Sequence, residues 1–183
     1  MKRRTFINRS ALASLGLLLG NRLVAQEQSL EISAEQEKTK GKPIIISTWN
    51  HGIAANEAAW KKLEEGGNAL DAVEAGVRVT ESDPENRSVG LGGLPDREGK
   101  VTLDACIMNH EQECGAVDFL EGIEHPISVA RKVMEETPHV MLVGKGAQKF
   151  ALEKGFERKN LLTEEAKQEW LKWKAKEDQK RPE

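Results

Sequence analysis

The sequence predicts an α/β fold in which amphipathic helices cover a small sheet. Apolar runs of strand length occupy 44–49 and 140–143, and residues 101–108 alternate between apolar and polar side chains. Between these runs lie longer segments with helical spacing of apolar residues, bounded by glycine, proline or asparagine. Strands and helices that alternate along a chain are typical of layered α/β proteins.

The first three elements are expected to be a strand followed by two helices. Residues 44–49 are apolar and largely β-branched, which predicts a central, buried strand. A helix should begin near Asn56 and end at Gly66, because glycine readily takes the left-handed conformation after a last helical turn. Asn68 can cap the second helix, which carries an acidic residue three positions later. Its apolar stripe consists of Leu70, Val73 and Val77.

The middle of the chain predicts a loop and a pair of strands. Residues 84–99 are rich in Gly, Pro, Asn and Asp, which favours a loop. The alternation over 101–108 predicts a strand with two distinct faces. Residues 109–113 are polar enough for a turn, and a partner strand should begin near Gly115.

The last third predicts two further helices around a short strand, and then a final helix. Pro126 suits the first turn of a helix that ends near 136. Residues 140–143 form a short buried strand, and the helix that follows it should end at Gly155. Thr163 can cap the last helix, on which Ala166, Trp170 and Trp173 share one face. Three or four strands are few for so many amphipathic helices, so further strands should come from more chain or from another subunit.

The two ends of the chain are expected to lie outside this fold. Residues 1–25 combine a twin arginine, a short apolar run and a small residue at the end, which is typical of a twin-arginine export signal. The apolar run is too short for a permanent membrane anchor. Residues 26–42 predict a disordered linker and 175–183 a charged tail, so the domain should span 43–174. An export signal of this kind implies a periplasmic or secreted protein.

Composition excludes several classes of function. The 183 residues carry a formal net charge of -3 and no tyrosine, which argues against nucleic-acid binding. Two cysteines cannot supply a disulfide framework, and whether Cys106 and Cys114 pair with each other stays open. Their spacing with His110 matches no strong zinc pattern, so we expect no metal site and no cofactor. The glycines of 90–93 lack the Gly-Lys-Ser/Thr of a phosphate-binding loop.

Seven blocks of sequence together resemble the glycosylasparaginase family, from about Pro43 to Trp173. The blocks are STWN at 47–50, EAAW at 57–60, GGNALDAVE at 66–74, RSVGLGGLPD at 87–96, TLDACIM at 102–108, PISVARKVM at 126–134 and TPHVMLVG at 137–144. Their order and spacing make the resemblance specific. One block alone, such as GGNALDAVE, would only be suggestive.

The resemblance implies an N-terminal-nucleophile hydrolase with an αββα sandwich, of which this chain forms the N-terminal part. In that family a precursor cleaves itself before a threonine, which then heads a β subunit and attacks the side-chain amide of glycosylated asparagine. The α subunit contributes a tryptophan that lines the substrate pocket, here Trp49, and a serine that hydrogen-bonds near the amino group of the nucleophile, here Ser88. Without the resemblance, Trp49 reads as a core residue and Ser88 as a loop hydroxyl.

The nucleophile itself is expected beyond Glu183. The family's His-Asp-Thr-Ile-Gly cleavage motif is absent, and no threonine in the sequence follows an aspartate. Asn109 and His110 also stand where many members have Asp-Gly, which should alter a turn. A threonine hydroxyl needs its own free α-amino group as base, so the chain alone is expected to be inactive.

The expected partner is therefore a threonine-led β subunit, in a heterodimer or a dimer of heterodimers. Two alternatives remain: the α part of a plant-type L-asparaginase or isoaspartyl peptidase, and an inert, truncated remnant of the enzyme.

Overall fold

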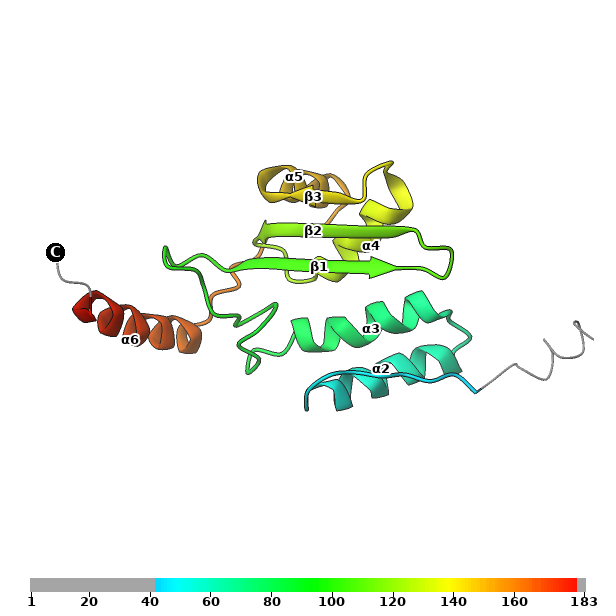
Figure 1. The fold of residues 1–183 in the computed structure, drawn as a ribbon, viewed down its shortest axis with the longest axis horizontal. Helices are drawn as coiled ribbons and strands as arrows, with labels where there is room; N and C mark the ends of the chain where they lie inside the picture. Colours follow the sequence, from blue (N-terminus) through cyan, green and yellow to red (C-terminus); the bar gives the residue numbers. More distant parts are fainter. Residues whose placement is uncertain (1–41, 181–183) are drawn as a thin grey trace, which may run out of the picture. The chain divides into compact units, whose positions relative to one another are not determined.

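The computed structural model describes residues 42–180, with side chains to residue 177. The chain divides between Ile44 and Ile45, and the helices and strands described here all lie on the C-terminal side of that division (Figure 1). The elements are α2 (Gly52–Glu64), α3 (Ala69–Glu81), β1 (Thr102–Met108), β2 (Cys114–Glu121), α4 (Pro126–Glu136), β3 (Met141–Val143), α5 (Gly144–Glu153) and α6 (Glu164–Lys180). The predicted export signal at 1–25 and most of the predicted linker at 26–42 lie outside the described residues.

Helices α2 and α3 form an antiparallel hairpin. Asn68 caps α3 as predicted: its Oδ1 accepts the N–H of Asp71 at 2.9 Å, while the Asp71 carboxylate accepts the N–H of Asn68 at 3.0 Å. The two helices approach closely at Gly76, where an added Cβ would lie 2.7 Å from the carbonyl oxygen of Ala55. This contact fixes how far α2 slides along α3, and it sets which residues share each end of the hairpin.

The three strands form one sheet in the order β1-β2-β3. β1 and β2 are antiparallel, with Cys106 opposite Ala116, whereas the short β3 is parallel to β2. The register shifts between Leu103 and Ala105, and Phe119, on the partner strand, has φ +53°. This irregularity is a bulge that bends the hairpin and redirects the side chains around it.

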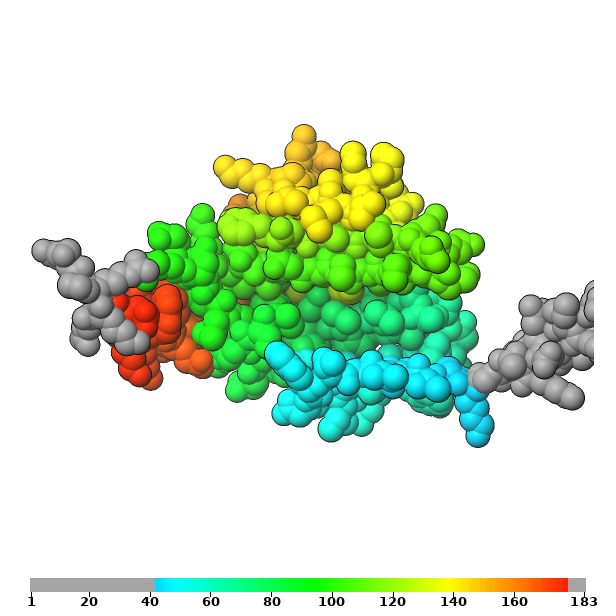
Figure 2. Space-filling view, viewed as in Figure 1, coloured from blue at the N-terminus to red at the C-terminus, as the bar shows by residue number. Residues whose placement is uncertain are grey.

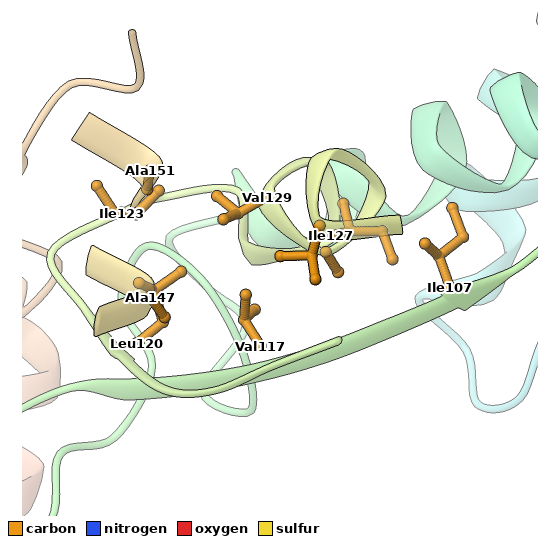
Figure 3. Packing of buried hydrophobic residues seen from close by; sticks show 10 residues of the cluster. Ile107, Val117, Leu120, Ile123, Ile127, Val129, Ala147 and Ala151 are labelled. Atoms are coloured by element: carbon orange, nitrogen blue, oxygen red, sulfur yellow. The ribbon is translucent and has the colours of Figure 1, made fainter. Parts of the chain in front are cut away.

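One face of the sheet carries the core. Helices α4 and α5 pack against β2, and α4 also packs against β1. Figure 3 shows Val117 and Leu120 of the sheet facing Val129 of α4 and Ala147 of α5. The core cluster consists of Ile107, Val117, Leu120, Ile123, Ile127, Val129, Ala130, Val133, Ala147 and Ala151.

The opposite face of the sheet has no described element over it. In Figure 1 α4 lies behind the strands, and Figure 2 shows the strands bare on the side nearer the viewer. The exposed side chains on the strands are Asp104, Cys106, Met108, Asp118, Phe119, Met141 and Val143. The mixed α/β class is therefore confirmed, with three strands in the described part of the chain.

Some local predictions were wrong. Residues 44–49 form no strand, and none of the three described strands pairs with this apolar run. The predicted buried strand at 140–143 shortens to β3, whose Met141 and Val143 are exposed because no element among residues 42–180 covers them. Helix α2 begins at Gly52, earlier than Asn56, and Trp173 on α6 is exposed.

Other local predictions were confirmed. Pro126 begins α4, Thr163 caps α6 through the N–H of Ala166 at 3.3 Å, and Ala166 is fully buried. Helix α6 continues to Lys180 and so takes in the first residues of the charged segment 175–183. No helix in the described part of the chain is both long and apolar enough to span a bilayer.

Candidate active site

The hairpin geometry brings the two predicted site segments to the same end of one structural unit. Trp49 lies just before the first residue of α2, and Ser88 lies in the loop that follows the last residue of α3. Because α2 and α3 are antiparallel, the start of α2 and the end of α3 lie together (Figure 1). Trp49 and Ser88, which are 39 residues apart in the sequence, thus lie at the same end of the α2–α3 hairpin.

Trp49 is an exposed side chain on an unusual backbone. Its φ is +66°, in the left-handed region that residues other than glycine seldom adopt, and its side chain is 74% exposed. The indole meets the His51 ring edge-on, with the ring centroids 5.6 Å apart. Such backbone conformations cost free energy and gather at functional sites, which supports a binding role for Trp49 over a core role.

The segment around Trp49 is tied to α2. The Trp49 carbonyl accepts the N–H of Gly52 at 3.3 Å, and the Ser47 hydroxyl donates to the side chain of Asn56. An added Cβ at Gly52 would lie 2.4 Å from the Ser47 Cβ, so only glycine fits this approach. The tryptophan is therefore held in place by the first turn of the helix.

Ser88 is exposed in a loop with its own hydrogen bonds. The Asn86 side chain accepts the N–H of Ser88 at 2.7 Å, which forms a tight turn just before the serine. The glycine-rich stretch that follows folds back on α3: the N–H of Leu91 donates to the carbonyl of Glu81 at 2.8 Å. The N–H of Gly92 donates to the carbonyl of Leu161, also at 2.8 Å.

Helix α6 braces the same loop from its other side. The Arg87 guanidinium donates to the Glu169 carboxylate at 2.9 Å, and to the carbonyl of Pro84. Gly99 packs against the ring of Trp170, whose indole nitrogen is buried without a partner among the described residues. Trp170 thus packs against the loop at Gly99, and Arg87, the residue before Ser88, is anchored to α6.

Glu81 is the buried ionisable residue of this region. It is 2% exposed, and its carboxylate accepts the N–H of Ile127 at 3.0 Å and lies 3.1 Å from the Nδ1 of His125. Burial raises the pKa of Glu81, while the contacts with His125 and Ile127 oppose that rise. Sequence reasoning missed this residue because a glutamate at a helix end normally faces water.

A second carboxylate arrangement lies on the open sheet face. Asp104 accepts the N–H of Phe119 at 2.8 Å, beside the bulge. The pKa of Asp118 is raised, chiefly by its hydrogen bond with Asp104 and then by the like charge of that residue. The strand alternation predicted that Asp104 would lie on the polar face, but the register that places it beside Asp118 needed the structure.

The structure gives no support to a disulfide or a metal site. Cys106 and Cys114 are free thiols on neighbouring strands, and the register places Cys106 opposite Ala116 and Cys114 opposite Met108. Among the side chains of residues 42–177, no group of three or more His, Cys, Asp or Glu could hold a metal ion. A cavity of about 460 Å³ borders Lys100, Glu121 and Arg158, but it is lined by neither Trp49 nor Ser88.

Comparison with known proteins agrees with the fold and with the sequence blocks. The family model described as Asparaginase matches residues 29–183, a range that includes both Trp49 and Ser88. A curated N(4)-(beta-N-acetylglucosaminyl)-L-asparaginase of Elizabethkingia miricola is 54% identical over 171 residues, which cover 93% of this chain and 49% of that protein. The enzyme of the same name in Rattus norvegicus is 44% identical over 133 residues, which cover 70% of this chain and 38% of that protein.

This chain spans about half the length of the curated relatives that it matches, or less. The matches nonetheless extend over most of the residues of this chain. Its mixed α/β fold holds both predicted site segments at one end of the α2–α3 hairpin. This protein belongs to the asparaginase family.

Proposed function

We propose that this chain is the α part of an amidohydrolase that cleaves the amide bond between N-acetylglucosamine and the side chain of asparagine. The observation that carries the proposal is the 54% identity, over 93% of this chain, to a relative whose name states that substrate. The arrangement of Trp49 and Ser88 supports it, because the two residues stand exposed at one end of the α2–α3 hairpin.

The proposed reaction is acyl transfer to a threonine supplied by the other half of the protein. Its hydroxyl oxygen bonds to the amide carbon of the substrate, and its proton passes through the free α-amino group to the leaving nitrogen. The carbon–nitrogen bond breaks and releases the glycosylamine. Water then attacks the ester on threonine and releases aspartate, which restores the free hydroxyl. The oxyanion donors that this chemistry needs would also come from the other half.

Two residues of this chain have proposed roles. The exposed indole of Trp49 offers an apolar wall against which a substrate can lie. The hydroxyl of Ser88 can hydrogen-bond near the amino group of threonine and orient it. Neither side chain can complete acyl transfer, so we propose that residues 1–183 alone are inactive.

The uncovered sheet face supports the proposed partner. Met108, Phe119, Met141 and Val143 are exposed on strands whose other face is packed against α4 and α5. A face of a sheet that is exposed to water is normally polar, and an apolar face is normally covered. This face is partly apolar. We propose that the threonine-led β subunit supplies a layer that covers it, in a heterodimer or a dimer of heterodimers.

The test is to produce residues 1–183 together with the C-terminal half of the Elizabethkingia relative, and to assay N-acetylglucosaminyl-asparagine. Hydrolysis should require both chains. Trp49→Ala should lower kcat/KM by about tenfold or more, equivalent to about 1.4 kcal/mol of transition-state stabilisation. The matched control is Trp173→Ala, another exposed tryptophan, which should leave kcat/KM unchanged.

Other substrates in the same assay separate the alternatives. Faster hydrolysis of free asparagine or of β-aspartyl peptides would replace the proposal with a plant-type asparaginase or isoaspartyl peptidase. If the two chains form a complex that hydrolyses none of these substrates, the remnant interpretation holds and the proposed activity is wrong.

We also propose that residues 1–25 direct the protein across the bacterial inner membrane through the twin-arginine route. The twin arginine, the short apolar run and the small residue at position 25 support this. Replacement of Arg3 and Arg4 by lysine should retain the protein in the cytoplasm on cell fractionation, whereas Lys2→Arg should not. Unchanged export of the double variant would refute this route.

A further inference from the structure

We infer that Glu81 is a positioning residue for the loop that carries Ser88. Its carboxylate accepts a hydrogen bond from α4, and its main-chain carbonyl accepts one from the loop. The inference rests on the proposed function for the role of Ser88. It assigns a purpose to a buried ionisable group that the proposed reaction does not otherwise use.

The carboxylate of Glu81 caps α4 from another helix. The first residue of α4 is Pro126, which has no N–H, and His125 before it makes no side-chain cap. The N–H of Ile127 is therefore the first amide of α4 that needs an acceptor, and Glu81 accepts it at 3.0 Å. A negative charge there also matches the positive end of the helix dipole. His125, 3.1 Å from the other carboxylate oxygen, completes the contact.

The main chain of Glu81 holds the loop. Glu81 is the last residue of α3, so its carbonyl has no acceptor role inside the helix and is open to another donor. The N–H of Leu91 donates to it at 2.8 Å. Gly90 lies against the same carbonyl: an added Cβ would be 1.9 Å from the Glu81 oxygen. The loop therefore contacts the end of α3 directly at Gly90, which lies two residues after Ser88.

These two contacts link α4 to Ser88 through one residue. The side chain anchors the end of α3 to the start of α4, and the main chain anchors the loop to the end of α3. If the side chain is lost, the last residue of α3 loses its contact with α4, and we expect the turn at 90–91 to shift with that end of the helix. Ser88 would then move relative to any group that it has to orient, at a cost in rate.

A matched control exists on the same helix. Glu74 also joins α3 to α4, through Arg131 at 2.8 Å and through the hydroxyl of Ser128, and none of these contacts involves the loop. Glu74→Ala therefore loosens the same pair of helices without touching the turn at 90–91. Glu81→Gln keeps the size of the side chain and an oxygen that can accept from Ile127.

The first test is hydrogen exchange on residues 1–183. Glu81→Ala should speed exchange by about tenfold or more at two places. Peptides from the start of α4 are affected because the N–H of Ile127 loses its acceptor, and peptides from 83–99 are affected because the end of α3 that holds the loop loses its anchor. Glu81→Gln should restore most of the protection, and Glu74→Ala should leave the peptides from 83–99 unchanged. Equal deprotection of 83–99 by Glu74→Ala, or none by Glu81→Ala, would overturn the inference.

The second test uses the two-chain enzyme and asks whether Glu81 acts through Ser88. Glu81→Ala should lower kcat about tenfold when Ser88 is present and have little effect in a Ser88→Ala background, since residues that act as a unit are not additive. Independent, additive losses would refute action through Ser88. If the wild-type complex has no activity, the proposed function fails, and the exchange measurement still decides whether Glu81 positions the loop.

Discussion

Replacement of Gly90 by alanine is predicted to damage the candidate site through two separable costs. Gly90 has φ +65°, and its added Cβ would lie 1.9 Å from the carbonyl oxygen of Glu81. The left-handed conformation costs an L-residue ~1–2 kcal/mol. The backbone must also shift to relieve the overlap, and such shifts typically cost a further ~1–3 kcal/mol at overpacked sites. We therefore expect Gly90→Ala to lower the free energy of unfolding by about 2–5 kcal/mol.

Gly66 isolates the first of these costs. It also has a positive φ, +88°, but an added Cβ there would meet no atom within 4 Å. Gly66→Ala should therefore cost only the conformational ~1–2 kcal/mol. Urea unfolding of both variants, followed by far-UV circular dichroism, gives the two free energies. The difference measures the contact between the loop and the end of α3.

Local loosening of the loop is a second way to relieve the overlap, and hydrogen exchange detects it. In that case the Leu91 amide loses protection in Gly90→Ala while the global unfolding midpoint changes less. The reasoning is refuted if Gly90→Ala and Gly66→Ala cost the same and the Leu91 amide stays protected in both. Such a result would mean that the loop does not rest on the carbonyl of Glu81.

Three further predictions concern stability and ionisation. Leu120→Ala, at a fully buried core position, should cost ~2–5 kcal/mol in urea unfolding, whereas the partly exposed Leu171→Ala should cost little. Burial raises the pKa of Glu81 in the folded state above its pKa in the unfolded chain. Its contribution to stability is therefore greatest at pH values below the unfolded-state pKa and is lost as the pH rises through the folded-state pKa. The stability of Glu81→Gln relative to wild type should therefore increase from pH 4 to 7, and a flat difference would contradict the raised pKa. Asp104→Asn should lower the pKa of Asp118 in an NMR titration, because it removes the like charge while keeping an oxygen for the N–H of Phe119.

Elements that carry their own pattern could be predicted from the sequence. The alternation over 101–108 predicted which side chains of β1 face the core, and buried Leu103 and Ile107 follow it. Asn68 and Asp71 predicted the start of α3 because a capping box is a local interaction between residues three apart. In each case the physical cause lies within a few residues of the sequence.

Features that depend on a distant partner could not be predicted. The run at 44–49 has the composition of a buried strand, but a strand also needs a second strand that pairs with it, and composition does not reveal that pairing. The cost of burying Glu81 is offset by the N–H of Ile127 on α4, which lies 46 residues away in the sequence. The positive φ of Trp49 likewise has no signal in the sequence, although the resemblance to glycosylasparaginases singled out the residue itself.

The bare side of the sheet has a consequence for the chain before any partner arrives. The two hairpins, α2–α3 and β1–β2, join neighbours in sequence, so they can form early from local contacts. A newly folded molecule then displays exposed strands to other copies of itself. Asp104 and Asp118 lie among the apolar side chains of that face, and their charge opposes stacking of one copy on another. Burial of these carboxylates against a second copy would be costly, so we expect them to disfavour self-association of this face.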